Sequence, residues 1–346
     1  MKEFLLRVLK FLWCKDIAVM SYGLKHFNLN LFFDWIFCGK YQYQYIRETT
    51  WEHIKTFSKY FSDKKYKKKL VKWLDEKSVE EVNQIEKNIK FVLKSTDSHL
   101  VICRKKFWIK QNKYEVEKYI KEYSKNIYFP LKLKEETVFY FKHWINEIKN
   151  LKQRMIWKDI IDCWAFVWDS ALMFSKELWF YETWWINHIF CIEPNPETRK
   201  ILNLTINKND LNQNVTIIPK WLWKEKKDLH MNMYAGASFV GDASFIKNQN
   251  VKSCIINVDT IDNIVENYWI IPWLIKWDIE WLEYDSILGS KKTIKEYKPI
   301  LLISIYHTWK DFYEIKPLIE SWNIWYKYMI RHLSTNISEE IELICY

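Results

Sequence analysis

The spacing of apolar and polar residues changes character partway along the chain. Over residues 64–93 and 114–126, apolar residues recur at helical spacing with charged residues between them, which predicts amphipathic helices. From about residue 157 onward, short apolar runs alternate with helical segments. We therefore predict a lysine-rich helical module over residues 1–150 and an α/β domain over residues 151–346, and a chain of 346 residues has room for both.

Eight apolar runs in the second part predict β-strands. The runs span residues 159–163, 188–193, 214–219, 254–258, 273–278, 299–306, 326–333 and 340–346. Strands that alternate with helices are typical of a doubly wound, mainly parallel sheet. Because ligands of such sheets bind outside the carboxyl ends of the strands, the residues that follow each run are the candidates for chemistry.

The pattern predicts no transmembrane segment and no metal site. No apolar run reaches the roughly 18 residues that a membrane span needs. Residues 1–15 are apolar but interrupted by Arg7 and Lys10, so we interpret them as an amphipathic helix, with a peripheral membrane contact as the alternative. The seven cysteines are scattered, odd in number and without a C-x-x-C pair, which fits reduced thiols in the cytoplasm.

A net charge of +10 raises the question of a nucleic-acid partner. The charge comes from 53 basic and 43 acidic residues, but only six of the basic residues are arginine, which reads phosphates and guanine edges best. The chain is also rich in asparagine and isoleucine, as is typical of AT-rich genomes. We therefore attribute the charge to codon usage and do not expect nucleic acid as a partner.

Tryptophan is abundant in this chain and glycine is scarce, with 21 and 5 residues. An ordinary domain is about 7% glycine, which would be roughly 24 residues here. Fifteen of the tryptophans lie from Trp157 onward, many of them between predicted strands and helices, where a positive φ is costly for any residue with a Cβ. We interpret these as UGA codons that specify glycine in the source. A Trp-rich protein with aromatic binding faces is the alternative.

The first predicted strand leads into a motif for a nucleotide-like ligand. Asp162 ends the strand, a tight turn follows, and a helix begins near Asp169, so backbone N–H groups at a helix N-terminus can approach a ligand closely. With glycine at positions 164 and 168, residues 162–170 read D-C-G-A-F-V-G-D-S and resemble the first motif of FkbM-type methyltransferases. The residues that this resemblance assigns to cofactor binding are Asp162, Trp164, Ala165, Phe166, Trp168 and Asp169.

Two further segments continue the resemblance on the cofactor side. Glu193 ends the next strand before Pro194 and Asn195, and an acidic residue roughly 20 to 30 positions after the turn suits the ribose hydroxyls of a nucleoside. A solvated glutamate at a helix N-terminus is the alternative for Glu193. In the family, the place of Lys220 and Trp221 lies along the adenine ring. Asp242 lies in a segment that resembles the following loop of the family, with a surface loop as the alternative.

The strongest match covers residues 258–294. With glycine at positions 273, 277 and 281 it reads P-G-L-I-K-G-D-I-E-G-L-E and resembles the family pattern I-K-x-D-x-E-G-x-E. The matching polar residues are Lys276, Asp278, Glu280 and Glu283. Three carboxylates within six residues must each be hydrated or paired, which favours a functional role.

We assign catalysis to Asp278, Glu280 and His307. Tyr306 ends the run at 299–306 and His307 follows it, and we expect the strand to bring both to the same face of the sheet. The segment S-I-Y-H before a helix resembles a bacterial branch of the family. The pKa of a histidine lies near neutrality, which suits a general base. For His307, orienting the substrate or capping the following helix are the alternatives.

The resemblance covers roughly residues 155–346 and implies both a fold and a reaction. The fold is a Rossmann-like class I methyltransferase fold, with a seven-stranded, mainly parallel sheet in the order 3-2-1-4-5-7-6 and strand 7 antiparallel. The reaction is O-methylation of a sugar, glycan or secondary-metabolite hydroxyl, with S-adenosyl-L-methionine as cofactor and a small molecule or glycan as acceptor. The alternative is a non-catalytic interaction protein with a degenerate Rossmann domain.

Overall fold

A computed structural model of the chain describes most of the α/β region and parts of the N-terminal region. The described residues are 43–45, 60, 63–94, 101–103, 113–129, 136–149, 151, 158–166, 169–179, 186–234, 237–240, 252–333 and 340–346. The amphipathic helix predicted for residues 1–15, and the candidate residues Trp168 and Asp242, lie outside them. Within the described part of the chain, no helix has the length and apolar character that crossing a membrane requires.

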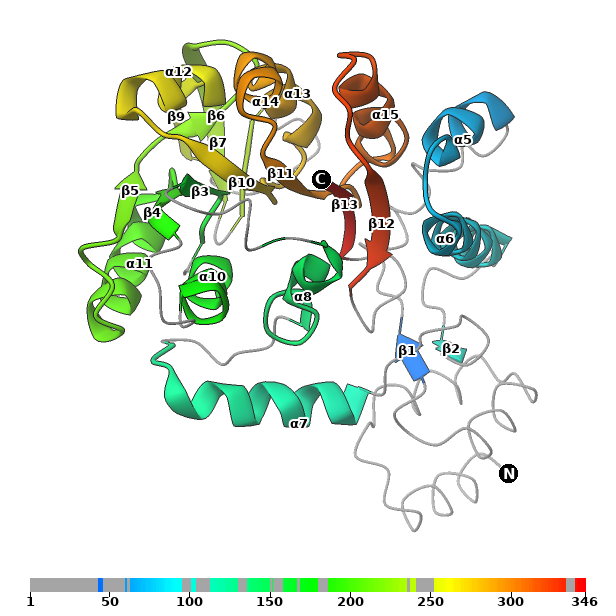
Figure 1. Ribbon diagram of the computed structural model, residues 1–346, viewed down its shortest axis with the longest axis horizontal. Helices are drawn as coiled ribbons and strands as arrows, with labels where there is room; N and C mark the ends of the chain where they lie inside the picture. The colour runs from blue at the N-terminus through cyan, green and yellow to red at the C-terminus, as the bar shows by residue number, and fades with distance from the viewer. Residues whose placement is uncertain are drawn as a thin grey trace.

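Seven strands form one mainly parallel sheet at the centre of the molecule (Figure 1). They are β3 (Lys158–Cys163), β4 (Ile186–Ile192), β5 (Val215–Ile218), β10 (Pro272–Trp277), β11 (Ile300–Ser304), β12 (Tyr328–His332) and β13 (Ile341–Cys345). Their order is β12-β13-β11-β10-β3-β4-β5, and β13 is antiparallel to both of its neighbours while the other pairs are parallel. Numbered along the chain, this is the order 3-2-1-4-5-7-6 with strand 7 antiparallel, so the predicted fold class is confirmed.

Helices cover both faces of this sheet, which explains why its strands are apolar throughout. One face packs against α12 (Ile261–Tyr268), α13 (Glu283–Leu288), α14 (Lys291–Tyr297) and α15 (Trp309–Glu320). The other face packs against α7 (Lys113–Tyr123), α8 (Glu136–Phe139), α10 (Asp169–Trp179) and α11 (Pro196–Lys208). Successive residues of a strand point to opposite faces, so Ile160 and Ile161 of β3 belong to different core clusters.

A second sheet of four strands was not predicted. It consists of β6 (Trp221–Leu222), β7 (Lys227–Tyr234), β8 (Ala237–Val240) and β9 (Lys252–Asp259), in the order β6-β9-β7-β8. The apolar run at 254–258 is therefore a strand, as expected, but it pairs with β7 and β6 rather than with the central sheet. The sequence of β7, KDLHMNMY, alternates polar and apolar residues, so it forms no apolar run.

Part of the N-terminal region, α5 (Lys64–Val71) and α6 (Glu76–Lys94), packs beside β12 and α15, while α7 and α8 cover one face of the central sheet. The elements of this region are β1 (Tyr43–Tyr45), α5, α6, β2 (Val101–Cys103), α7, η3 (Ser124–Asn126), α8 and η4 (Lys142–Glu147). The helix predicted over 64–93 is two helices, because the chain turns at Trp73, where φ is 62°. Leu70 and Ile85 share a core cluster with the sheet. The boundary near residue 150 stays a prediction.

One buried arginine ties this region to the sheet. Arg331 of β12 is 3% exposed, and its guanidinium Nη2 lies 3.2 Å from Asp75 Oδ2 and 3.0 Å from Glu147 Oε2. Its Nη1 also donates a hydrogen bond to Ser78 Oγ. Arg331 therefore joins the start of α6 and the end of η4 to the same edge strand.

Tryptophan is common at left-handed backbone positions. Among the described residues, thirteen residues other than glycine have a positive φ. Five of them are tryptophans: Trp73, Trp144, Trp164, Trp269 and Trp281. A left-handed residue with a Cβ costs about 1–2 kcal/mol, and glycine is the usual residue there. Trp273 and Trp277 differ from these five, because both are buried within β10 and neither has a positive φ.

Candidate active site

The carboxyl ends of four neighbouring strands bring the predicted polar residues to one edge of the sheet. Asp162 at the end of β3 is paired in register with Lys276 of β10 on one side and with Cys191 of β4 on the other. Glu193 directly follows β4, and Asp278 directly follows β10. The site therefore has two parts. We call the part at β3 and β4 the cofactor side, after its predicted role, and the part at β10 and β11 the acidic side.

The turn after β3 has the backbone shape of a glycine-containing loop. Trp164 has a φ of 66° and Phe166 a φ of 43°, both left-handed. The N–H groups of Trp164 and Ala165 donate to the carbonyl oxygen of Ile192, at 2.8 and 3.2 Å, which fixes the turn against β4. Asp169 is the first residue of α10.

Glu193 holds the two cofactor-side loops together. Its Oε2 accepts a hydrogen bond from the Phe166 N–H at 2.9 Å, and its Oε1 accepts one from the Asn195 N–H at 2.8 Å. Burial raises the pKa of Glu193 to about 7, since its side chain has little contact with water. Glu193 is therefore not a solvated helix cap; Asn195 is the cap of α11, because its side chain accepts from the N–H groups of Glu197 and Thr198.

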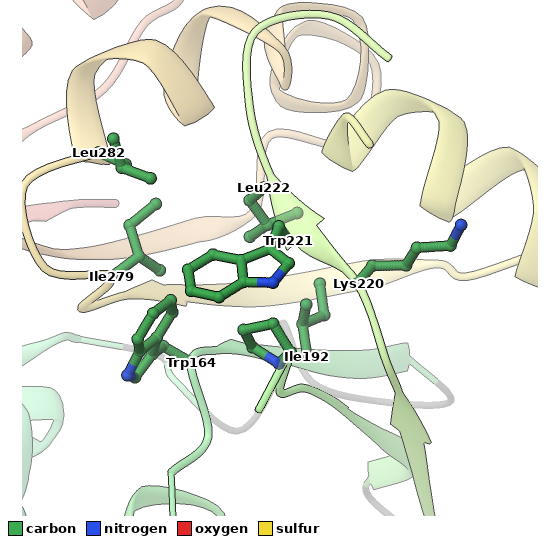
Figure 2. Close-up of a pocket in the computed structure, with 8 residues that line it drawn as sticks. Trp164, Ile192, Lys220, Trp221, Leu222, Ile279 and Leu282 are labelled. Atoms are coloured by element: carbon green, nitrogen blue, oxygen red, sulfur yellow. The ribbon is translucent and has the colours of Figure 1, made fainter. Parts of the chain in front are cut away.

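Two indoles fill the space between these loops (Figure 2). The rings of Trp164 and Trp221 meet edge to face, with centroids 4.9 Å apart and planes at 72°. The cavity that remains beside them measures about 10 Å³, about enough for one water molecule. Its other lining residues are Ile192, Pro194, Lys220, Leu222, Ile279 and Leu282. The side chain of Lys220 extends away from the indoles, and its Nζ donates to Asn257 Oδ1 at 2.7 Å.

Lys276 connects the two parts of the site. Its Nζ lies 3.4 Å from Asp162 Oδ1 and 3.8 Å from Asp278 Oδ2, and the lysine side chain is only 6% exposed. The sequence marked Lys276 as a motif match but gave no sign that it bridges the ends of β3 and β10.

On the acidic side, three carboxylates lie around one histidine. We call His307, Asp278, Glu280 and Glu283 the His307 cluster. Nδ1 of His307 lies 2.9 Å from Glu283 Oε1, while Nε2 lies 3.3 Å from Glu280 Oε2 and 3.7 Å from Asp278 Oδ1. Burial lowers the pKa of His307, but the carboxylates of Glu283, Glu280 and Asp278 outweigh it and raise the pKa to about 10. At neutral pH the imidazole is therefore protonated in the absence of another cation.

Glu283 is turned inward and holds both His307 and the loop after β10. It is fully buried, and its Oε1 also accepts the backbone N–H of Ile279 at 2.8 Å, which holds the loop after β10. Asp278 and Glu280 differ from Glu283, because their side chains are 30% and 52% exposed and can be reached from solvent. Burial and the charge of Glu283 raise the pKa of the neighbouring Asp311 to about 7.

Tyr306 and His307 differ in their hydrogen-bond partners, although the carboxylate charges of the His307 cluster act on both. The chain leaves β11 at Ser304, so both residues follow the strand, with ring centroids 4.1 Å apart. The Tyr306 hydroxyl donates to Glu340 Oε1 at 3.2 Å, whereas His307 faces the loop after β10. The sequence gave no signal for Glu340, because its segment carries no motif.

The predicted catalytic residues Asp278, Glu280 and His307 are thus close together. On the cofactor side, Trp164, Phe166 and Glu193 are also adjacent. These placements leave their roles as proposals.

Three residues of the strongest motif, Thr260, Asp262 and Gly289, have structural roles at the starts of α12 and α14. Asp262 accepts the N–H groups of Lys292 and Thr293, and Thr260 caps α12. A Cβ at Gly289 would clash with the carbonyl oxygen of Trp223, so this position requires glycine.

Comparisons with known proteins agree with this geometry. Residues 162–329 match the family model described as the methyltransferase FkbM domain. A search of curated proteins gave no match. Among solved structures, methyltransferase FkbM from Methylobacillus flagellatus KT matches with a TM-score of 0.52 and 17% sequence identity, covering 81% of this chain and 58% of that chain. This chain therefore spans little more than half of that structure's length.

Two other solved structures match with TM-scores too low to support an argument. A putative O-methyltransferase from Klebsiella pneumoniae has a TM-score of 0.37 and 6% identity, covering 67% of this chain and 88% of that chain. Fibrillarin from Aeropyrum pernix, in complex with natively bound S-adenosyl-L-methionine, has a TM-score of 0.33 and 11% identity, covering 59% of this chain and 72% of that chain. The family match therefore identifies residues 162–329 as a methyltransferase FkbM domain, and the strand order of the central sheet and the Methylobacillus structure agree with its fold.

Proposed function

We propose that the chain is an S-adenosyl-L-methionine-dependent methyltransferase that methylates a hydroxyl of a sugar, glycan or secondary metabolite. The observation that carries the proposal is the bridge made by Lys276 between Asp162 and Asp278. It links the turn assigned to the cofactor with the half-exposed carboxylates assigned to the acceptor. A methyl donor and a hydroxyl must meet at such a junction, since methyl transfer depends mainly on placing the two reactants.

With tryptophan at position 164, the cofactor side has no room for S-adenosyl-L-methionine. Trp164 and Trp221 leave a cavity of about 10 Å³ where a nucleoside would have to lie. We therefore propose that the functional protein has glycine at Trp164 and at the other tryptophans with a positive φ. The backbone supports this, because it already has the left-handed shape that glycine favours at these positions.

In the glycine form, the donor set suits the cofactor. The turn after β3 offers backbone N–H groups near the N-terminus of α10, and Glu193 offers a buried carboxylate for ribose hydroxyls. Ala165 and Phe166 belong to this turn, Asp169 begins α10, and Pro194 and Asn195 follow Glu193 in the chain. We keep Trp168 in the cofactor set on the resemblance alone. Lys220, Trp221 and Asp242 are proposed for the adenine end. When bound, the cofactor supplies a sulfonium methyl group.

The residues of the chain then handle the proton of the acceptor hydroxyl. We assign proton acceptance to Asp278, because it is partly exposed, whereas His307 with a pKa of about 10 already carries a proton at neutral pH. His307 holds Asp278 and Glu280 in place by charge. Glu280 is the second carboxylate that an acceptor could reach.

The test compares the chain that has the printed sequence, which we call the written chain, with the variant Trp164→Gly/Trp168→Gly. We expect calorimetry to show weak S-adenosyl-L-methionine binding by the written chain and stronger binding by the double variant. The double variant should then transfer a labelled methyl group to members of a pooled glycan library. Tight binding by the written chain would contradict the role of the indoles.

The codons of the source gene distinguish this enzyme from the alternative, a non-catalytic interaction protein. UGA codons at Trp164 and Trp281, in a genome that reads UGA as glycine, would support the enzyme. UGG codons there would mean that the cofactor space is filled in the native protein, and the non-catalytic alternative would hold.

A further inference from the structure

The His307 cluster has the composition of a metal site as well as that of a catalytic centre. We propose that Asp278, Glu280 and His307 bind a divalent cation of the Mn²⁺ or Zn²⁺ type, and that Glu283 positions His307 for this purpose. The sequence gave no hint of a metal, because the usual cysteine and histidine spacings are absent from it.

The distances suit a shared ion. Two ligand atoms at about 2.1 Å from one metal ion lie about 3.0–3.4 Å from each other. Nε2 of His307 is 3.3 Å from Glu280 Oε2 and 3.7 Å from Asp278 Oδ1. Ligand atoms of Asp278, Glu283 and His307 all lie within 4.8 Å of one another. The Glu280 distance lies within this range, and a small rotation of the partly exposed Asp278 carboxylate would bring its oxygen into the range as well.

The imidazole itself points to a ligand independently of the carboxylates. His307 is 5% exposed, and its Nε2 makes no hydrogen bond with any residue in the described part of the chain. Its other nitrogen, Nδ1, is held by Glu283 Oε1 at 2.9 Å. A histidine that binds a metal through one nitrogen usually has the other held by a carboxylate in this way.

The local charge also favours a cation. Three carboxylates surround one buried imidazole, and Lys276 is shared between Asp278 and Asp162. The proton on His307 and a metal ion would compete for the same Nε2, since only neutral imidazole binds metal. One nitrogen with carboxylate oxygens suits ions such as Mn²⁺ and Zn²⁺ better than a purely oxygen-binding ion.

An ion here would leave coordination positions open towards the exposed side of the loop. A hydroxyl bound to such an ion has a lowered pKa, which eases loss of its proton. This consequence rests on the proposed function, whereas the binding site itself does not.

The experiment titrates the purified full chain with Mn²⁺ alone and measures free Mn²⁺ by electron paramagnetic resonance. We expect one bound ion per chain, released by Zn²⁺ and weakened in mildly acidic buffer, where protons compete for His307. Asp278→Asn and Glu280→Gln should each weaken binding by about tenfold or more, the scale for removing a group that supports a metal. Both changes keep the side-chain shape, and circular dichroism checks that the variants fold.

The matched control is Asp285→Asn, another acidic residue on α13, which pairs with Lys224 at 3.9 Å and lies outside the His307 cluster. It should bind Mn²⁺ as the parent does. Absence of stoichiometric binding by the parent, or equal weakening in all three variants, would overturn the proposal. Because the titration uses neither cofactor nor acceptor, its outcome is separate from that of the methyl-transfer assay. Mn²⁺ binding by the parent, together with no methyl transfer by the Trp164→Gly/Trp168→Gly variant, would leave the metal site standing and remove the proposed function instead.

Discussion

The two sides of the site differ in what they are built from. The cofactor side consists mainly of backbone, namely the turn at Trp164 and the N–H groups that bind Glu193. The acidic side consists of the side chains of the His307 cluster. Under the proposed glycine interpretation, tryptophan at these positions fills a site made of backbone but leaves a site made of side chains largely intact. The acidic side is then the part of the proposed active site that the printed sequence preserves.

The largest expected effect tests the acidic side alone. In the variant with glycine at positions 164 and 168, Asp278→Asn keeps the shape of the side chain and removes its charge. We expect methyl transfer to fall by about a hundredfold or more, the usual scale for losing a positioned base, while cofactor affinity changes little. A labelled-methyl assay and calorimetry measure the two quantities. Unchanged turnover would transfer the role to Glu280 or to placement alone.

The next prediction tests the cofactor side alone. In the same glycine variant, Glu193→Ala should weaken S-adenosyl-L-methionine binding by about 1–3 kcal/mol, the scale for losing a charged hydrogen-bond partner. Calorimetry gives the dissociation constant. Because Glu193 also binds the N–H groups of Phe166 and Asn195, Glu193→Gln serves as the control that keeps part of this network. An unchanged constant in Glu193→Ala would count against a ribose-binding role.

The pH dependence of stability isolates the charge on the acidic side. The pKa of His307 is raised from 6.5 to about 10 on folding, so its protonated form stabilises the folded state. This contribution is complete below about pH 6.5 and is lost as the pH rises towards 10. Urea unfolding with a chelator present should show the parent losing more stability over this range than His307→Gln. Parallel curves for the two proteins would show that the raised pKa is wrong.

The smallest expected effect is on stability, and it tests, at a position outside the site, whether tryptophan stands where the backbone favours glycine. Trp269 is 89% exposed with a φ of 52°, at the end of α12. Trp269→Gly should raise the free energy of unfolding by about 1 kcal/mol, because it removes a left-handed residue with a Cβ. Trp325 is the control, since it is 97% exposed but has no positive φ, so Trp325→Gly should bring no gain. Thermal unfolding measures both, and equal shifts would mean that backbone conformation is irrelevant.

The sequence predicted the central sheet well, because its strands are buried on both faces and appear as apolar runs. It did not predict the second sheet, since β7 mixes polar and apolar residues. It also missed the break at Trp73, because tryptophan gives no signal for the left-handed turn that the chain makes there.

For the site, motif spacing located Asp278, Glu280 and His307 along the chain but could not show which way their side chains point. Nothing in the spacing indicates that Lys276 reaches Asp162, or that Glu283 points inward to His307. Likewise, Glu193 could be placed at a strand end but not distinguished from a solvated cap. These details depend on which way side chains turn in three dimensions.

Arg331 bears on whether the α/β region can exist by itself. Its guanidinium is buried on β12 and is neutralised by Asp75 and Glu147, which both lie before residue 150. Cutting the chain at that point would remove these partners together with Val82, Ile85 and Ile89 of α6, which share a core cluster with the sheet. Exposing the apolar surface that they cover would cost on the order of a few kcal/mol. A truncated protein would thus start with much of an ordinary domain's stability already lost. The two predicted modules are, in this respect, a single folding unit.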